Sequence, residues 1–267
     1  MSKHSAITLQ RQRGLSLVEL MIGLTLGLIL LLGIIQVFIS SKQTFATNDA
    51  MAKLQENGRF ALEFITQSAR QAGYTSPGST LDRPFPVERT VCGVGNSGNN
   101  PCAVNGSGSG ADVVGFTFEP PIIDGAKRDC AGAVVPDNNL VVNTFYIIPA
   151  DADNPTAALG CKSFNRTTNA ALSAGQRLID GIDSLQVLYG ITTGGNSQSV
   201  NQYVSADRVS NWGKVVAVRI AVLANSVDVL NPAPVQRNYY LLDAAPFSSN
   251  DGRARQVFTT TVQFKNL

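Results

Sequence analysis

One ionisable side chain, Glu19, lies within a long apolar run and carries the clearest chemical consequence in the chain. A carboxylate inside a membrane-length segment raises the free energy of insertion by about 2.5–3.5 kcal/mol, so it needs a functional reason. Between Leu15 and Ser41 no Lys, Arg or His could neutralise it. Cleavage after Gly14 would create an α-amino group on Leu15, one helical turn from Glu19. That amine could pair with Glu19 in the same copy or in a neighbouring one.

Four cysteines could form disulfides or bind zinc: Cys92, Cys102, Cys130 and Cys161. In an exported domain they should be oxidised. Four cysteines allow three pairings. We predict sequential pairing, Cys92–Cys102 and Cys130–Cys161, because it closes the shortest loops. Zinc is the alternative, but the C-x-x-C spacing usual in a structural zinc site is absent.

Other catalytic or ligand-binding chemistry is poorly supported by the sequence. The only histidine is His4, so removal of the leader would leave none for a catalytic triad or a His-ligated metal. The segment 151–154 lacks the twelve-residue spacing of a calcium loop and is expected to be a polar turn. No phosphate-binding glycine loop occurs. The net charge of +2 does not indicate a nucleic-acid surface. We expect no enzymatic activity, no cofactor, no metal and no nucleic-acid partner.

A basic leader and an apolar segment position Glu19. Residues 1–14 carry Lys3, Arg11 and Arg13 and no acidic side chain. The run 15–39 is long enough to cross a hydrocarbon core of about 30 Å as a helix. The basic flank should stay in the cytoplasm, which places the C-terminal part outside. A plain signal anchor would leave Glu19 unexplained, and a cleaved secretory signal would need a small-residue site that is missing.

The segment from Phe45 to Gly73 keeps a helical period, with small and apolar residues on one side and polar residues on the other. The first set is Leu54, Gly58, Ala61, Ile65, Ala69 and Ala72; the second is Lys53, Glu56, Arg59, Glu63, Gln67 and Arg70. We interpret the charged stripe as a solvated face. Gly73, followed shortly by Pro77, is a plausible stop.

About 190 residues follow this helix, enough for one domain with its own core. Alternating apolar residues predict strands over 216–222 and 258–264. Weaker strand candidates are Val113–Phe118, Leu140–Ile148, Ser184–Ile191 and Asn238–Leu242. The Gly/Ser/Asn-rich stretch Gly93–Gly110 reads as a long loop. The predicted fold class is α+β, with a long N-terminal helix packed on a sheet-rich, loop-rich head.

The residues around Glu19 resemble the class III signal of type IV pilins and pseudopilins. The matching pattern is Gly14 followed by Leu15-Ser16-Leu17-Val18-Glu19-Leu20-Met21-Ile22. In that family a prepilin peptidase cuts after the glycine and methylates the new N-terminus, and the glutamate registers each subunit against its neighbour. Two features depart from the family pattern: Leu15 replaces the commoner phenylalanine, and no proline interrupts the later apolar run.

Further segments resemble PilW-type minor pilins. They are 54–62 (LQENGRFAL), 70–74 (RQAGY), 178–190 (LIDGIDSLQVLYG) and the terminus 253–267. The region 75–175 matches nothing in that family that we can identify. The resemblance implies the pilin fold, with a leader at 1–14, a transmembrane and assembly helix at 15–40, its amphipathic half at 41–73 and a periplasmic head at 74–267.

The resemblance implies a non-catalytic minor pilin that takes part in type IV pilus assembly, in an initiating tip complex or within the fibre. Its partners would be other minor pilins, the major pilin, the prepilin peptidase and the inner-membrane assembly platform. It would reside in the bacterial inner membrane before assembly and in the pilus at the cell surface afterwards. The alternatives are a J-like pseudopilin of type II secretion and a pilus-tip adhesin.

Overall fold

The computed structural model divides the chain into two compact units, Met1–Thr47 and Asn48–Leu267. The residues it describes are 14, 16–77, 84–85, 102–136, 139–168, 170–193 and 199–266. Leu15, Cys92, His4 and the first half of the predicted loop Gly93–Gly110 lie outside them. The predicted boundary between the membrane segment 15–40 and the amphipathic segment 41–73 falls within the first unit.

Helix α1 (Leu17–Gln71) begins in the first unit and ends in the second. From Leu17 to Ala46 all of its side chains are exposed, and the large apolar ones up to Phe45 are each at least 44% exposed. By length and composition this part of the helix could cross a membrane. An apolar surface of this kind, exposed on all sides of a helix, needs lipid or other helices around it.

In the second unit, α1 buries one side only. The buried residues at helical spacing include Ala50, Leu54, Gly58, Ala61, Ile65 and Ala69. The helix ends where predicted: Gly73 adopts φ +82°, a conformation that favours glycine at a helix C-terminus. The Gly73 N–H donates to the Thr117 carbonyl at 2.9 Å, and the Asn266 side chain donates to the Ala72 carbonyl at 3.3 Å. The chain's last residues therefore help to cap α1.

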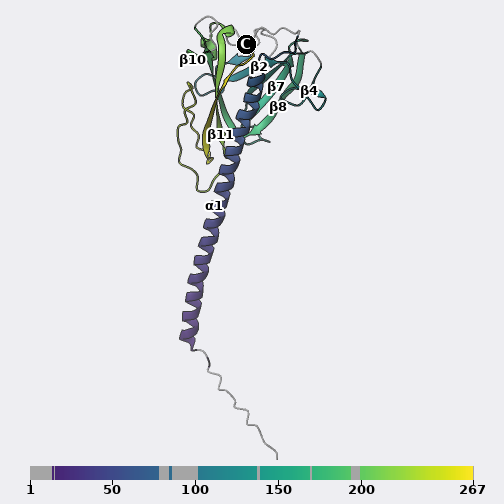
Figure 1. Ribbon diagram of the computed structural model, residues 1–267. Coiled ribbons are helices and arrows are strands. Elements are labelled where there is room, and N and C mark those ends of the chain that lie inside the picture. Colours follow the sequence, from purple (N-terminus) through teal and green to yellow (C-terminus); the bar gives the residue numbers. More distant parts are fainter. Residues whose placement is uncertain are drawn as a thin grey trace, which may run out of the picture. The chain divides into compact units, whose positions relative to one another are not determined.

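The strands form three antiparallel sheets with the orders β1-β2-β6-β7-β8, β10-β9-β11-β12 and β3-β4-β5 (Figure 1). The strands are β1 (Ala103–Val104), β2 (Val113–Phe118), β3 (Ile122–Ile123), β4 (Ala126–Arg128), β5 (Val134–Val135), β6 (Val141–Ile148), β7 (Ala158–Asn165), β8 (Ala170–Asp180), β9 (Ile182–Ile191), β10 (Gln202–Val204), β11 (Val215–Asn225) and β12 (Arg255–Gln263). Two short 3₁₀ helices, η1 (Ala206–Arg208) and η2 (Trp212–Lys214), precede β11.

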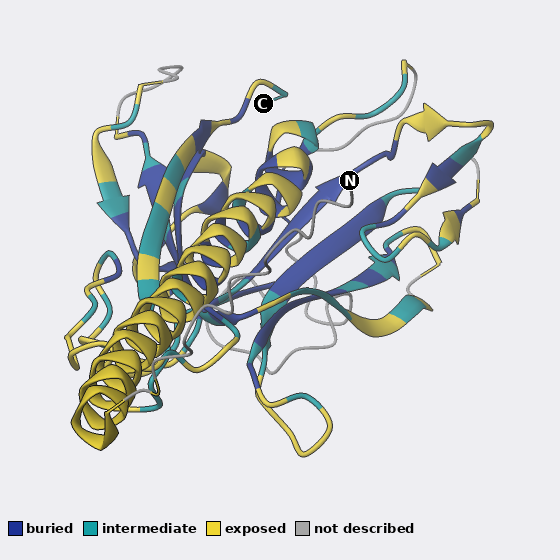
Figure 2. Cartoon of the chain, turned by 90° about the horizontal axis from the view of Figure 1, so that it is seen from below, coloured by how far each residue is buried: buried dark blue, intermediate teal, exposed yellow. Residues whose placement is uncertain are grey.

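One hydrophobic core joins the second-unit part of α1 to both larger sheets. At its centre, the Phe85 ring lies 5.3–5.9 Å, centroid to centroid, from the rings of Phe116, Tyr189, Trp212 and Phe264. Figure 2 shows the inner strands buried while the outward face of α1 is exposed. This helix packed on antiparallel sheets confirms the predicted α+β class.

Gly58 is the point of closest approach between α1 and β12. A Cβ at Gly58 would overlap the ring of Phe258 on β12. Glycine within a helix is normally unfavourable by about 1 kcal/mol relative to alanine. Here the missing side chain allows the Phe258 ring to lie against the helix backbone, which explains why the predicted apolar stripe contains a glycine.

Asp112 ties a glycine-rich turn to the four-stranded sheet. Its carboxylate is buried and accepts hydrogen bonds from the N–H groups of Gly106 and Val187, both at 2.7 Å. Burial raises the pKa of Asp112 to about 7, and the two hydrogen bonds oppose that rise only in part. A buried acid near neutrality makes the stability of this unit depend on pH.

Two aspects of the strand prediction were wrong. The segment Asn238–Leu242 forms no strand and contains only the single bridge Tyr239–Phe247. The adjoining strand β11 is already paired on one edge by β9 and on the other by β12, so it offers no free edge. The sequence also failed to predict β7 and β8. Strand β8 is an edge strand with a largely exposed surface, so it lacks the alternation on which the prediction relied.

We expect Gly58→Ala to lower the free energy of unfolding by about 1–3 kcal/mol despite the better helix propensity of alanine, because the new methyl group overlaps Phe258. Denaturant unfolding of the detergent-solubilised chain, followed by fluorescence of the single tryptophan, measures the change. The double variant Gly58→Ala/Phe258→Ala should be more stable than Phe258→Ala alone, because alanine favours the helix and the ring is no longer there to overlap. A destabilising effect of equal size with and without the ring would contradict this explanation.

We expect the stability of the wild-type chain to fall, relative to Asp112→Asn, as the pH rises from about 4 to about 7. The ordinary pKa of 3.8 applies in the unfolded chain and about 7 in the folded one. The folded state therefore binds the proton more tightly, and its advantage decreases by up to about 1.4 kcal/mol per pH unit across this window. Urea unfolding at several pH values tests it; parallel pH profiles for the two proteins would exclude Asp112 as the source.

Candidate assembly site

The start of α1 presents the residues that the sequence singled out in the first unit. Gly14 and Ser16 are exposed and lie outside the helix, while Leu15 between them is outside the described residues. The helical hydrogen bonding begins with the Leu20 N–H, which donates to the Ser16 carbonyl at 3.1 Å. Gly14 and Ser16, the described residues on either side of Leu15, are thus in exposed, non-helical chain.

Glu19 lies in the first turn of α1 and is exposed. The neighbouring Leu17, Val18 and Leu20 are each more than half exposed. Within the described part of the chain, Glu19 forms no ion pair, and the first Lys or Arg that follows it is Lys42. The partial positive charge at a helix N-terminus favours a carboxylate here, although by only about 0.3–1 kcal/mol at an exposed site. The carboxylate therefore lacks a full countercharge.

Other polar groups on the first-unit part of α1 behave differently. The hydroxyl of Thr25 donates to the Ile22 carbonyl at 2.9 Å, and that of Thr44 donates to the Ser40 carbonyl at 2.9 Å. These hydroxyls satisfy their hydrogen bonding within one helical turn, as is common for such residues in membrane helices. The ionised carboxylate of Glu19 differs, because it only accepts hydrogen bonds and so cannot bond to the helix carbonyls. Its possible partners within the helix are the free N–H groups of the first turn, which carry no full charge.

The cysteines lie in the second unit. A disulfide joins Cys130 to Cys161, whose Cα atoms are 6.3 Å apart, and so links the turn after β4 to strand β7. Cys102 is also disulfide-bonded. Cys92, its predicted partner, lies outside the described residues. The carboxylate of Asp151 accepts hydrogen bonds from the backbone N–H groups of Asp153, at 3.0 Å, and Asn154, at 2.7 Å, as in an ordinary polar turn.

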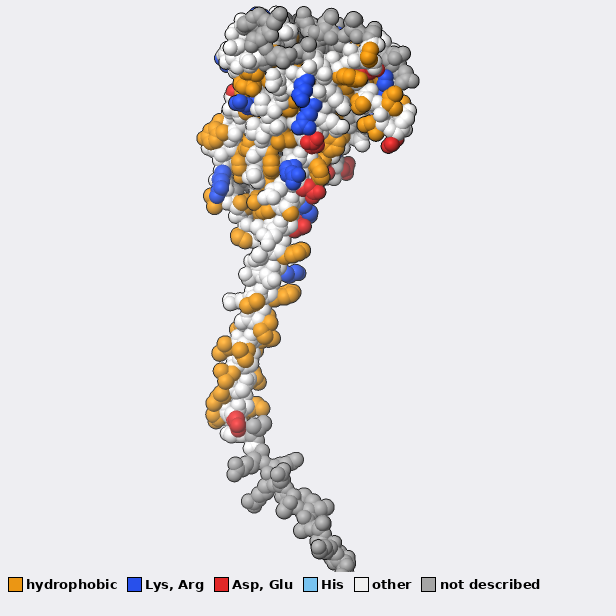
Figure 3. Space-filling view, viewed as in Figure 1, with side chains coloured by type: hydrophobic (Ala, Val, Ile, Leu, Met, Phe, Trp, Pro, Cys, Tyr) orange, Lys and Arg blue, Asp and Glu red, His pale blue; other side chains and the backbone are white. Residues whose placement is uncertain are grey.

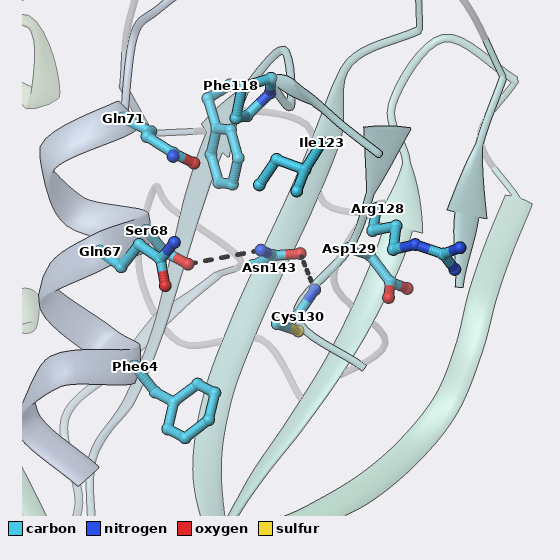
Figure 4. A pocket seen from close by; sticks show the side chains of 11 residues that line it. Phe64, Gln67, Ser68, Gln71, Phe118, Ile123, Arg128, Asp129, Cys130 and Asn143 are labelled. Carbon is cyan, nitrogen blue, oxygen red and sulfur yellow. Dashed lines mark hydrogen bonds between the residues drawn. The ribbon is translucent and has the colours of Figure 1, made fainter. Parts of the chain in front are cut away.

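A small pocket of about 180 Å³ lies between α1 and strands β3, β4 and β6 in the second unit (Figure 4). At its floor the Asn143 amide donates to the Ser68 hydroxyl at 3.4 Å and accepts from the Cys130 N–H at 3.3 Å. The nearby Asp129 carboxylate accepts from the Ser163 hydroxyl and from two backbone N–H groups of the following turn. These polar groups are occupied by hydrogen bonds within the fold.

A buried ion pair in the second unit is also structural. Lys127 on β4 lies 2.6 Å from Glu119, and both are buried. The hydrogen bond from Lys127 lowers the pKa of Glu119 to about 2, aided by the hydrogen bonds from Ser76. The pair therefore fastens β4 to the chain that follows α1. Among the described residues, no group of His, Cys, Asp or Glu could hold a metal ion.

The sequence did not predict these contacts in the second unit. Glu119 and Lys127 are 8 residues apart across a hairpin, and Asp112 meets Val187 from 75 residues away. No periodic pattern links such pairs, because their contact depends on which strands become neighbours. The available signal was weak: acidic residues at the ends of apolar strands are more often solvated than buried.

Two family profiles match the chain. The family described as Type IV Pilus-assembly protein W, PilW, matches residues 145–266. The Prokaryotic N-terminal methylation motif matches residues 9–35, which include Gly14 and Glu19. No curated protein matches the chain.

Among solved structures, the chain is similar to a type IV-like pilin from Thermus thermophilus, with 16% identity and a TM-score of 0.46. That similarity covers 80% of this chain and 97% of the other. The two family profiles cover the N-terminal signal and the C-terminal part of the chain, whereas the pilin-like segments 54–62 and 70–74 lie between them. The chain is thus similar to type IV pilin-like proteins at its N-terminal methylation motif and to the PilW type over residues 145–266.

Proposed function

We propose that this chain is a minor pilin that takes part in type IV pilus assembly as a structural, non-catalytic subunit. One observation carries the proposal: an unneutralised carboxylate, Glu19, in the first turn of an otherwise apolar and fully exposed helix. The match to the methylation motif over residues 9–35, which include Gly14 and Glu19, supports the proposal.

In the proposed mechanism, the leader 1–14 holds the subunit in the inner membrane until a prepilin peptidase cleaves after Gly14. Cleavage creates the amine of Leu15, the positive charge that Glu19 lacks. An ion pair in an apolar environment is favourable only when the partners meet closely. The pairing of Glu19 with the amine of a neighbouring subunit would therefore set the axial position of each incoming helix.

Three glycines support packing against other helices. At Gly23, Gly27 and Gly33 an added Cβ would meet no atom within 4 Å, so packing within this chain does not require a glycine there. Small residues let helix backbones approach closely in an apolar environment. The exposed apolar surface and these notches fit a helix that lies first in lipid and then among the helices of a fibre.

The proposed partners are other minor pilins, the major pilin, the peptidase and the inner-membrane assembly platform. Residues 15–40 would form the membrane and assembly segment, 41–73 its amphipathic continuation and 74–267 the periplasmic head, which reaches the cell surface in the pilus. The family description as a pilus-assembly protein favours this machine over type II secretion.

We expect the mature protein to begin at Leu15 and to carry a methyl group on its α-amino group. Mass spectrometry of the N-terminal peptide from inner-membrane and sheared-pilus fractions measures both features. Gly14→Trp should prevent cleavage and leave residues 1–14 attached, while the neighbouring control Ser16→Ala should be processed normally. A natural N-terminus at Met1, or one beyond Ile39, would refute the proposed role.

We expect Glu19→Ala to be processed at the same position but to enter pili at least about tenfold less, the factor that corresponds to 1.4 kcal/mol. The loss follows because the amine of Leu15 keeps its charge without a partner. Quantitative immunoblots of sheared pili against membrane fractions measure incorporation. Thr25→Ala is the matched control, since its hydroxyl is satisfied within its own helix. Normal incorporation of Glu19→Ala would remove the pairing argument.

A further inference from the structure

The outward face of α1 in the second unit carries charges of alternating sign. Glu56, Arg59, Glu63 and Arg70 follow one another at intervals of three, four and seven residues, and all four are exposed. These intervals keep them on one side of a helix with 3.6 residues per turn. Figure 3 shows red and blue side chains alternating along this face. We name these four residues the outer seam.

The charges of the outer seam form no ion pairs within the described part of the chain. The neighbouring Lys53 pairs with Asp49 at 3.0 Å and with Asp228 at 3.2 Å. By contrast, none of the four seam residues forms an ion pair with any other residue that the structure describes. Their charges are therefore available to a partner.

Apolar surface accompanies these charges. Phe60 is 48% and Phe64 is 39% exposed. Phe60 lines a groove of about 550 Å³ together with Ala52, Gln55 and the seam residues Glu56, Arg59 and Glu63. A face that was only solvated would gain nothing from exposed phenyl rings. Covering such a ring stabilises a complex by removing apolar area from water.

The order of charges is self-complementary for parallel helices only when they are staggered. With two copies in register, Glu56 faces Glu56 and Arg59 faces Arg59, which is repulsive. A shift of three to four residues, about 5 Å along the axis, brings Glu56 of one copy level with Arg59 of the other. The same shift brings Arg59 level with Glu63. A shift of seven residues places Glu56 level with Glu63, which is repulsive, and Glu63 level with Arg70, which is attractive, so the two pairs oppose each other.

We propose that the outer seam is a docking surface for a second copy of this chain, parallel to the first and displaced by three to four residues. The parallel orientation rests on the proposed function, in which all copies insert into one membrane in the same direction. The charge order then selects the axial displacement, as flanking charges set partner register in coiled coils.

The test uses the full chain in the inner membrane, with a photo-crosslinking residue replacing Gln55 in the groove. Wild-type copies should give a crosslinked homodimer. Arg59→Glu makes both predicted pairs repulsive, and the homodimer should decrease roughly fivefold or more. Arg237→Glu, an equal charge reversal at an exposed position in the 226–254 connection, is the matched control and should leave crosslinking unchanged.

A triple inversion separates self-recognition from general electrostatics. In Glu56→Arg/Arg59→Glu/Glu63→Arg, copies carry opposite signs but remain complementary to one another, so the homodimer should return. Failure of the inverted copies to pair would overturn the proposal. Exclusive crosslinking to a different subunit would also overturn it.

The same samples keep this inference separate from the proposed function. Each variant is checked for an N-terminus at Leu15 and for the Cys130–Cys161 disulfide, which reports a folded head. Correct processing and pilus incorporation without charge-dependent homodimers would refute the seam and leave the minor-pilin role intact. Charge-dependent homodimers of a chain that is never processed would refute the minor-pilin role and leave the seam.

Discussion

The carboxylate of Glu19 imposes the constraint on which the other features of this protein depend. It sits in an apolar helix whose remaining surface is suited to lipid, and among the residues that the structure describes it has no ion-pair partner. A charge in that setting is costly unless it is paired, which is the reason for the proposed pairing with the amine of a processed chain. This requirement links the leader, the apolar segment and assembly into one physical problem.

The second part of α1 meets a different requirement. Here one side of the helix belongs to the core of the head, with Gly58 against Phe258 and the helix end capped by Asn266. Because β12 contacts the helix through Phe258 and the chain just after β12 contacts it through Asn266, this C-terminal segment holds the head on α1. The opposite side of α1 is then left outside the core, and its charges can act between molecules.

Buried ionisable groups in the head serve to hold loops. Asp112 secures a glycine-rich turn against β9, and Glu119 with Lys127 secures the small sheet. Such groups often mark active sites, but here each polar atom is directed at backbone or at an opposite charge. A structural scaffold with long connections needs these anchors, because turns that lack apolar residues cannot be held by hydrophobic burial.

The sequence by itself determined the properties that depend on local composition and period. These are the apolar run with Glu19, the one-sided burial of α1 after residue 48 and the strands with clear alternation, such as β11. Only the tertiary structure decided which distant groups meet: Phe85 at the centre of the aromatic core, Gly58 at Phe258, and Asp112 at Val187. The physical reason is that these contacts depend on the order in which strands pair, and pairing order joins residues far apart in sequence without leaving a local pattern.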